Sequence, residues 1–184
     1  MSESSTPRAM TRPTKKALSR RRRTMSLELS TILDAPLERV WQEVNRPELL
    51  RYVAAPLLTF TPVEPARFPE VWEEREYVTR IRQFGILPLG LQVIHIERPS
   101  SPDRTHLLRD NGRGSLSRIW DHMILVEGLP GERTKYTDRV EVGAGLLTPL
   151  IWAFARVFYA HRQRRWHKLV ASRFSYASER RSPS

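Results

Sequence analysis

Asp138 is the residue whose type and position most clearly point to chemistry. Alternation along residues 132–142 places it on one strand face with Tyr136 and Val140. A carboxylate facing an interior needs a cationic or hydrogen-bonding partner. Arg162 is the expected partner, because its helical angle falls near the middle of the apolar face of the last predicted helix. We predict an Asp138–Arg162 pair inside or at the mouth of a pocket, where it clamps helix to sheet or meets an anionic ligand head group. In the alternative, Asp138 bonds backbone amides and Arg162 reaches solvent at the rim.

Trp120 and His122 share a face of a second predicted strand, residues 115–127, with aliphatic neighbours. They would line the same pocket, where His122 could act as a polar handle or a proton-transfer group. The opposing interpretation is a packed tryptophan and a histidine bonded to a neighbouring carbonyl. That interpretation is favoured for His122, because no carboxylate is adjacent in sequence on its face and Asp121 points the other way.

The remaining polar and aromatic candidates lie on other elements around the expected cavity. His95 shares a face with two aliphatic residues, and Tyr77 belongs to another strand that is predicted to line the pocket. The full set of predicted ligand-binding residues is Trp120, His122, Tyr77, His95, Tyr136, Asp138, Phe158 and Arg162. The catalytic candidates among them, if a reaction takes place, are His122 and Asp138.

Metal and cofactor sites are not predicted. His161 and His167 are six residues apart on the last helix, whereas a spacing of four would align two metal ligands. The chain contains no cysteine, which excludes disulfides and thiolate metal sites and fits a cytoplasmic protein. A nucleophile elbow, a P-loop and a dinucleotide-binding glycine motif are absent from the sequence.

The elements that must position these residues form an α+β pattern. Residues 25–33 alternate as a strand, and a short amphipathic helix follows Pro36, with a second helical turn or two in residues 47–52. Short Pro/Gly-rich breaks then separate segments with strand character, which indicates an antiparallel meander. The predicted strands are residues 57–61, 71–83, 91–97, 104–110, 115–127 and 132–142, and residues 111–114 are interpreted as a turn.

The last element is a long helix that begins at Pro149, where Thr148 can cap it. No Pro or Gly interrupts the chain before Pro183, and apolar residues including Phe158 fall on one broad face. The fold class is therefore a curved antiparallel sheet of about six to seven strands around a long C-terminal helix, with two short helices after the first strand. The space between a long helix and a curved sheet is a natural ligand cavity.

Residues 1–23 have a different composition from the rest of the chain. They hold eight Lys/Arg and one Glu, which accounts for +7 of the net charge of +11. We predict a disordered basic tail (1–23), a domain (24–177) and a disordered C-terminal tail (178–184). The basic tail could make weak electrostatic contact with nucleic acid or an anionic membrane. The alternative is a solvated extension, or a chain whose natural start is Met25.

Taken together, the order and spacing of several motifs across residues 25–172 resemble the SRPBCC superfamily, the START-like or helix-grip proteins. The motifs are Ile32-Leu33-Asp34-Ala35-Pro36 with Val40-Trp41, Gly85-Ile86-Leu87-Pro88-Leu89-Gly90, Trp120-Asp121-His122, Tyr136-Thr137-Asp138-Arg139-Val140-Glu141, Gly145-Leu146-Leu147-Thr148-Pro149 and Phe158-Tyr159-Ala160-His161-Arg162. The resemblance, which is to a polyketide cyclase-like bacterial branch, implies a helix-grip fold with an apolar cavity. It does not select a reaction, because this fold carries many functions.

Three functions remain open at the level of sequence. The first is binding, transport or sequestration of a hydrophobic or amphipathic small molecule. The second is a cyclase/dehydratase-like enzyme that uses the same cavity for substrate positioning. The third is contact with nucleic acid or a membrane surface through the basic tail and the cluster Arg162, Arg164, Arg165 and Lys168. No segment is long and apolar enough to predict a membrane span.

Overall fold

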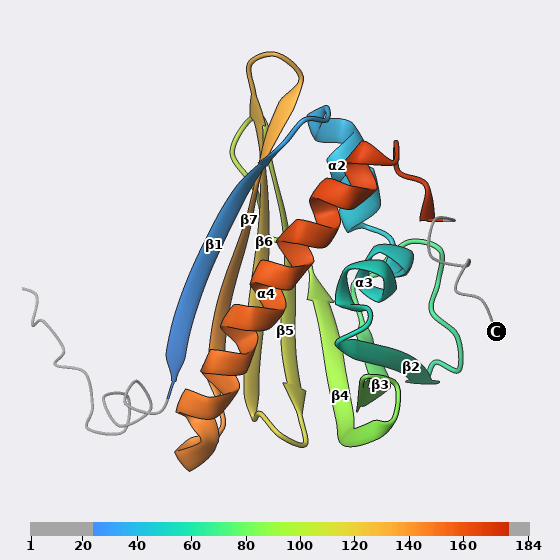
Figure 1. Cartoon of the computed structure of the whole chain (residues 1–184), viewed down its shortest axis with the longest axis vertical. Helices are drawn as coiled ribbons and strands as arrows, with labels where there is room; N and C mark the ends of the chain where they lie inside the picture. Colours follow the sequence, from blue (N-terminus) through green and yellow to red (C-terminus); the bar gives the residue numbers. More distant parts are fainter. Residues whose placement is uncertain (1–23, 177–184) are drawn as a thin grey trace, which may run out of the picture.

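The computed structural model describes residues 24–176, and the predicted tails 1–23 and 178–184 lie outside them. Seven antiparallel strands form one sheet in the order β1-β7-β6-β5-β4-β3-β2, and the long helix α4 lies diagonally across it (Figure 1). The strands are β1 (Met25–Leu33), β2 (Leu58–Glu64), β3 (Glu76–Gln83), β4 (Leu87–Glu97), β5 (Thr105–Gly114), β6 (Ile119–Leu129) and β7 (Arg133–Gly143). The helices are α2 (Leu37–Val44), α3 (Pro47–Ala54), the 3-10 turn η1 (Gly145–Leu147) and α4 (Thr148–Ala171). The predicted helix-grip fold is confirmed.

The two short helices connect β1 to the far edge of the sheet. Pro36 precedes α2 and Pro47 opens α3, the positions where a missing backbone N–H is tolerated. Val40 and Val44 turn into the core from α2, as their spacing predicts. The helices cover one end of the sheet beside the C-terminal half of α4 (Figure 1).

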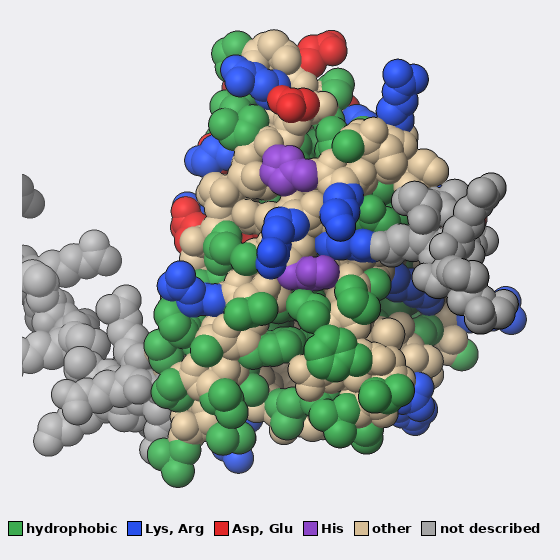
Figure 2. All heavy atoms as spheres, viewed as in Figure 1, with side chains coloured by type: hydrophobic (Ala, Val, Ile, Leu, Met, Phe, Trp, Pro, Cys, Tyr) green, Lys and Arg blue, Asp and Glu red, His purple; other side chains and the backbone are tan. Residues whose placement is uncertain are grey.

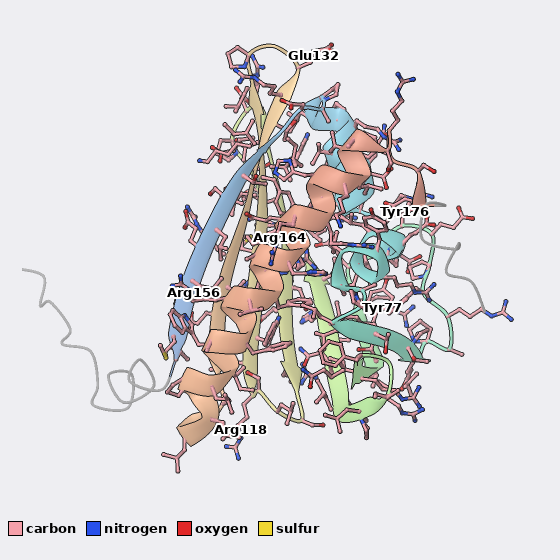
Figure 3. All side chains as sticks on the ribbon, in the orientation of Figure 1. Tyr77, Arg118, Glu132, Arg156, Arg164 and Tyr176 are labelled. Atoms are coloured by element: carbon pink, nitrogen blue, oxygen red, sulfur yellow. The ribbon has the colours of Figure 1, made fainter. Side chains whose placement is uncertain are left out.

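Helix α4 runs from Thr148 to Ala171, and most residues of its buried face lie between Ala155 and Leu169. Arg162 and Arg165 belong to that buried face, with only 4% and 6% of their surface exposed. This corrects the predicted basic cluster: only Arg164 and Lys168 of the four reach solvent, and Figure 3 shows Arg164 on the outward side of the helix. Thr148 does not cap the helix with its side chain. Its hydroxyl instead donates to the carbonyl of Gly145 in η1.

Several predicted strand boundaries differ from the structure: β2 ends at Glu64, β4 begins at Leu87 and β6 begins at Ile119. Two further differences have identifiable reasons. Residues 71–75 are not part of a strand; there the backbone N–H of Trp72 bonds Asn45, and the Trp72 ring enters the core. Residues 111–114 are not a turn but the end of β5, which pairs with β4 through Gln92 and Gly114. A Cβ on Gly112 would lie 2.8 Å from the carbonyl oxygen of Val93. The glycines therefore permit close approach of two strands, which composition alone made look like a turn.

The interior consists of two clusters of buried hydrophobic residues. One lies beneath α2, α3 and the C-terminal half of α4, and is centred on Trp166 and Tyr136. The other lies beneath the N-terminal half of α4, and includes Phe158 and Val140. The grip of the helix on the sheet is thus tight at the C-terminal end of α4, and the free volume is located toward its N-terminal half.

Candidate functional site

A cavity of about 380 Å³ lies between α4 and the concave face of the sheet. Its wall is almost entirely aliphatic and aromatic, with contributions from α3, β2–β6 and α4; examples are Ile81, Ile94, Leu108, Ile124, Phe154 and Phe158. In Figure 2, hydrophobic side chains gather on the molecular surface around the end where α4 begins. The volume is within the range of sites for small organic molecules.

Besides Arg46, which pairs with Glu48, three ionisable side chains interrupt the apolar wall. Asp110 comes from β5, His122 from β6 and Arg162 from α4; His122 and Arg162 are buried, and Asp110 is half-buried. Tyr159 and a few neutral polar side chains also reach the cavity. A ligand would therefore meet a mostly apolar surface with one concentrated polar region.

Asp138 on β7 is the centre of the polar network behind this region. Its Oδ1 lies 2.8 Å from His122 Nε2 and accepts a hydrogen bond of 2.9 Å from the Tyr136 hydroxyl. Arg162 Nη2 is 3.8 Å from the same oxygen and donates to the Tyr136 hydroxyl at 3.3 Å. Gln163 Nε2 donates to Asp138 Oδ2 at 3.3 Å and to the Leu29 carbonyl at 2.9 Å. The predicted Asp138–Arg162 pairing is present as a direct contact.

Asp138 carries a negative charge although it is fully buried. Burial opposes its ionisation, but the hydrogen bonds from His122 and Tyr136 and the charge of Arg162 outweigh that effect and hold the pKa of Asp138 below its ordinary value. Burial also opposes the charge of Arg162, yet the Tyr136 phenol and the Asp138 carboxylate hold the pKa of Arg162 above its ordinary value. The pair is therefore a buried ion pair supported by neutral hydrogen-bonding groups.

His122 is held neutral and in one tautomer. Burial lowers the pKa of His122, and the attraction of Asp138 only partly offsets this. Because the ionised Asp138 has no proton to give, the proton between the two groups sits on His122 Nε2 and leaves Nδ1 as an acceptor. The ring also contacts Tyr159, with 4.8 Å between centroids. A neutral, oriented imidazole in an apolar cavity can accept or relay a proton.

The partner of His122 differs from the prediction from sequence, which favoured a backbone carbonyl. Asp138 is 16 positions away in sequence, but β6 and β7 pair so that Asp138 is opposite Ile124. The diagonal neighbour on the same face is His122, two residues along. The strand register, which alternation alone does not specify, therefore creates this contact.

Asp110 is a functional candidate that the prediction missed. It is opposite His122 in the β5–β6 register, and its Oδ1 accepts a hydrogen bond of 2.9 Å from the His95 backbone N–H. Burial raises the pKa of Asp110 to about 8, although the His95 N–H opposes the shift and the nearby Asp121 adds to it. Asp110 is thus a neutral carboxylic acid at pH 7, able to donate one hydrogen bond. In the sequence, Asp110 is the last residue of a predicted strand and directly precedes residues 111–114, which were interpreted as a turn. A carboxylate at that position was the available signal.

Among the described residues, one hydrogen-bond donor of the Arg162 side chain lacks a partner. Its guanidinium lies 5.3 Å from the Tyr159 ring centroid and 5.9 Å from that of Phe158, so two aromatic rings flank the charge. Nη2 bonds Tyr136, whereas the buried Nε has no hydrogen-bond partner in the part of the chain described. A buried donor without a partner is unusual, and a ligand or water acceptor would satisfy it.

The other predicted site residues separate into three groups. Trp120, His122, Phe158 and Arg162 line the cavity. Tyr136 and Asp138 do not line it but lie behind His122 and Arg162 as supports. Tyr77 and His95 neither line it nor touch this network.

Tyr77 and His95 are corrections to the predicted site. Tyr77 packs against Trp72, with 4.9 Å between centroids, and its hydroxyl bonds the backbone of Glu73; Figure 3 shows it beside β2, away from α4. His95 lies on the other face of β4, 3.9 Å from carboxylates of both Glu76 and Glu97. In residues 91–96, hydrophobic residues occur on both faces of the strand. The alternation of the sequence therefore could not show which face is directed toward the interior.

Within residues 24–176, no group of three or more His, Cys, Asp or Glu side chains is placed to hold a metal ion. Over the same residues, no helix combines the length and the apolar character needed to cross a membrane.

Comparison with known proteins agrees with the fold. A family model described as "Domain of unknown function (DUF8410)" matches residues 31–170. A search of curated proteins found no match.

Similar solved structures include an aromatase/cyclase and a START protein. The Zhui aromatase/cyclase from a Streptomyces species is 12% identical with a TM-score of 0.56, over 84% of this chain and 98% of that one. A START superfamily protein from Mycobacterium smegmatis is 11% identical with a TM-score of 0.56, over 80% of this chain and 97% of that one. Truncated norcoclaurine synthase from Thalictrum flavum is 12% identical with a TM-score of 0.55, over 80% of this chain and 93% of that one. At these identities the likeness shows a START-like, SRPBCC fold.

Proposed function

We propose that this chain, which belongs to the DUF8410 family, binds a hydrophobic or amphipathic small molecule in its internal cavity. The observation that carries the proposal is the cavity itself: about 380 Å³ of space under α4, with an apolar wall and one buried polar region. Solved structures of the same fold are described as an aromatase/cyclase and as norcoclaurine synthase, whose named activities concern organic molecules. Their names support a small organic ligand over a macromolecular one.

The charge balance of the polar region specifies the polar end of the ligand. The positive charge of Arg162 is matched by the negative charge of Asp138. His122 is neutral, and Asp110 is neutral below about pH 8. Among the ionisable groups, the donors that we assign to the ligand are Arg162 Nε–H, which has no partner in the part of the chain described, and the Asp110 carboxylic acid. We infer a ligand with an uncharged acceptor, such as a ketone or ester carbonyl, rather than the anionic head group considered from sequence.

A matched pair of ligands tests this inference. We expect 2-undecanone to raise the melting temperature of the protein at neutral pH more than decanoate does, at equal concentration. The two have similar chains, but a carboxylate would place an unbalanced negative charge next to Asp138. A larger effect of decanoate would contradict the inferred polar end. The absence of any effect from either compound, and from a neutral naphthylamine fluorophore, would count against a binding cavity.

A second candidate function is proton-transfer catalysis of the cyclase/dehydratase kind. The observation that favours it is His122, which lines the cavity as a neutral base and is oriented by a buried carboxylate. A ketone held by Arg162 and Asp110 would have its α-protons acidified by the same hydrogen bonds. His122 would take an α-proton, the carbonyl oxygen would accept the electron pair as an enolate, and return of a solvent proton would restore the ketone and base.

Deuterium exchange separates the enzyme from the binder. An enzyme of this kind should speed incorporation of deuterium at the α-carbons of 2-undecanone in heavy water, followed by NMR. His122→Gln should abolish the acceleration and retain the shift in melting temperature. Exchange at the uncatalysed rate in the wild-type protein would exclude this candidate and leave the binding proposal standing.

A further inference from the structure

One end of the molecule exposes an unusual concentration of large hydrophobic side chains. Of the twelve such side chains exposed within residues 24–176, eight lie on three neighbouring segments. These are the β3–β4 hairpin, the β5–β6 loop and the start of α4. The most exposed are Leu146 at 100%, Ile86 at 81% and Leu150 at 67%. We call these three segments, residues 84–91, 115–118 and 146–150, the apolar rim.

The apolar rim surrounds the entrance to the cavity. Leu91, Leu116 and Leu150 are exposed and line the cavity at the same time. Backbone hydrogen bonds join the segments: Ser115 donates to Leu91, and Arg118 donates to Gly143, just before η1. Figure 2 shows hydrophobic side chains on this end of the surface, in agreement with the ribbon of Figure 1, where the hairpin, the loop and the start of α4 reach the same end.

The charges near the rim have one sign. The sequence segments that form this end, residues 80–91, 112–120 and 142–150, contain four arginines and no Asp or Glu. Arg113 is neutralised by a two-fold contact with Glu76. Arg80 and Arg118 are exposed, and Figure 3 shows Arg118 projecting at the rim. Exposed hydrophobic side chains that are bordered by arginines and not by acidic residues are complementary to a surface that is negatively charged outside and apolar inside, as an anionic lipid bilayer is.

The chain segment that precedes β1 carries further positive charge and is joined to the domain at the same end. Met25 pairs with Val142, beside η1, so residues 1–23 join the domain next to the rim. Those residues carry a net charge of +7.

We propose that the apolar rim docks on an anionic lipid surface, with the mouth of the cavity facing the bilayer. Ile86, Leu87 and Leu146 enter the interface between head groups and acyl chains, while the surrounding arginines contact lipid phosphates. A second copy of the chain fits less well, because two copies meeting through this end would bring like charges together. Docking is independent of the function proposed above, but it would let an apolar ligand exchange between bilayer and cavity without crossing water.

Flotation with lipid vesicles tests the proposal on the full chain. We expect it to bind phosphatidylcholine vesicles containing about one quarter phosphatidylglycerol, and to bind pure phosphatidylcholine and high-salt samples more weakly. Ile86→Glu/Leu146→Glu should lower the partition coefficient about tenfold or more. Both side chains are highly exposed, so the fold should be retained and circular dichroism should be unchanged.

A matched double variant controls for charge. Ile32→Glu/Val157→Glu adds the same two charges at exposed hydrophobic positions outside the rim, and it should bind as the wild type does. Equal binding by the two double variants would overturn the proposal, as would no vesicle binding by the wild-type chain. A dimer in sedimentation that the rim variant abolishes, with no vesicle binding, would assign the rim to self-association. Ile124 lines the cavity outside the rim, so vesicle binding that persists when Ile124→Trp fills the cavity would distinguish docking from ligand capture.

Discussion

At the scale of residues, the site depends on how five buried polar groups share charge. Asp138 accepts from His122, Tyr136 and Gln163 and pairs with Arg162, so every partner helps to keep one carboxylate ionised. Sequence alternation and helical angle were sufficient to predict the Asp138–Arg162 pair, since each side chain interrupts an otherwise apolar face. They did not reveal His122–Asp138 or Asp110, because both depend on the register between strands.

The first prediction concerns the ion pair. Asp138→Asn should lower the free energy of unfolding by about 3 kcal/mol or more, because it leaves the buried charge of Arg162 without a counter-charge. Urea unfolding measures the change. In Asp138→Asn/Arg162→Met the second substitution should recover part of the loss. Strictly additive effects of the two substitutions would show that the residues do not interact.

The second prediction concerns pH and Asp110. Its pKa is about 4 in an unfolded chain and about 8 in the folded one, so the folded state binds the proton more tightly. The resulting stabilisation is fully present below about pH 4 and is lost as the pH rises through about 8.

Asp110→Asn keeps an acceptor for the His95 N–H and removes this titration. Relative to the wild type, the variant should therefore gain stability as the pH rises between these limits, by on the order of a few kcal/mol. Urea unfolding of both proteins across the range measures the difference. Parallel stability profiles would contradict the assignment of a neutral Asp110.

At the scale of elements, the long helix was the easiest to predict and the β4–β5 pairing the hardest. An uninterrupted run without Pro or Gly and a broad apolar face are enough to specify α4. Residues 111–114 contain two glycines, which ordinarily mark a turn, yet here they admit the backbone of β4 at close range. Whether residues 111–114 form a turn or the end of a strand depends on their contact with β4, which is distant in sequence. The local sequence does not encode that contact.

The third prediction tests that close approach. Gly112→Ala should destabilise the fold by about 1–3 kcal/mol, because its Cβ would lie 2.8 Å from the Val93 carbonyl oxygen, an immovable backbone atom. Gly128→Ala is the control, since its nearest neighbour is the flexible Leu37 side chain at 3.3 Å. Thermal unfolding of the two variants should therefore differ clearly. Equal melting temperatures would show that β4 and β5 are not so closely paired at Gly112.

At the scale of the whole molecule, α4 grips the sheet firmly at one end and leaves a cavity at the other. The buried network joins the two regions, because Arg162 borders the cavity while its partners Asp138 and Tyr136 belong to the packed interior. The presence of a cavity followed from the fold class. Its volume, its opening beside the apolar rim and its polar groups follow from side-chain packing, which periodicity does not describe.

Native mass spectrometry of the purified chain tests the central claim, that this cavity holds an apolar small molecule, most directly. Leu89 lines the cavity, so Leu89→Trp should fill it, whereas Leu87→Trp on the same strand adds the same ring at an exposed position that does not line the cavity. We expect the wild type and Leu87→Trp to carry a non-covalent organic adduct that is released on denaturation, and Leu89→Trp to lack it. An adduct retained equally by all three proteins, or absent from all three after incubation with 2-undecanone, would contradict the account.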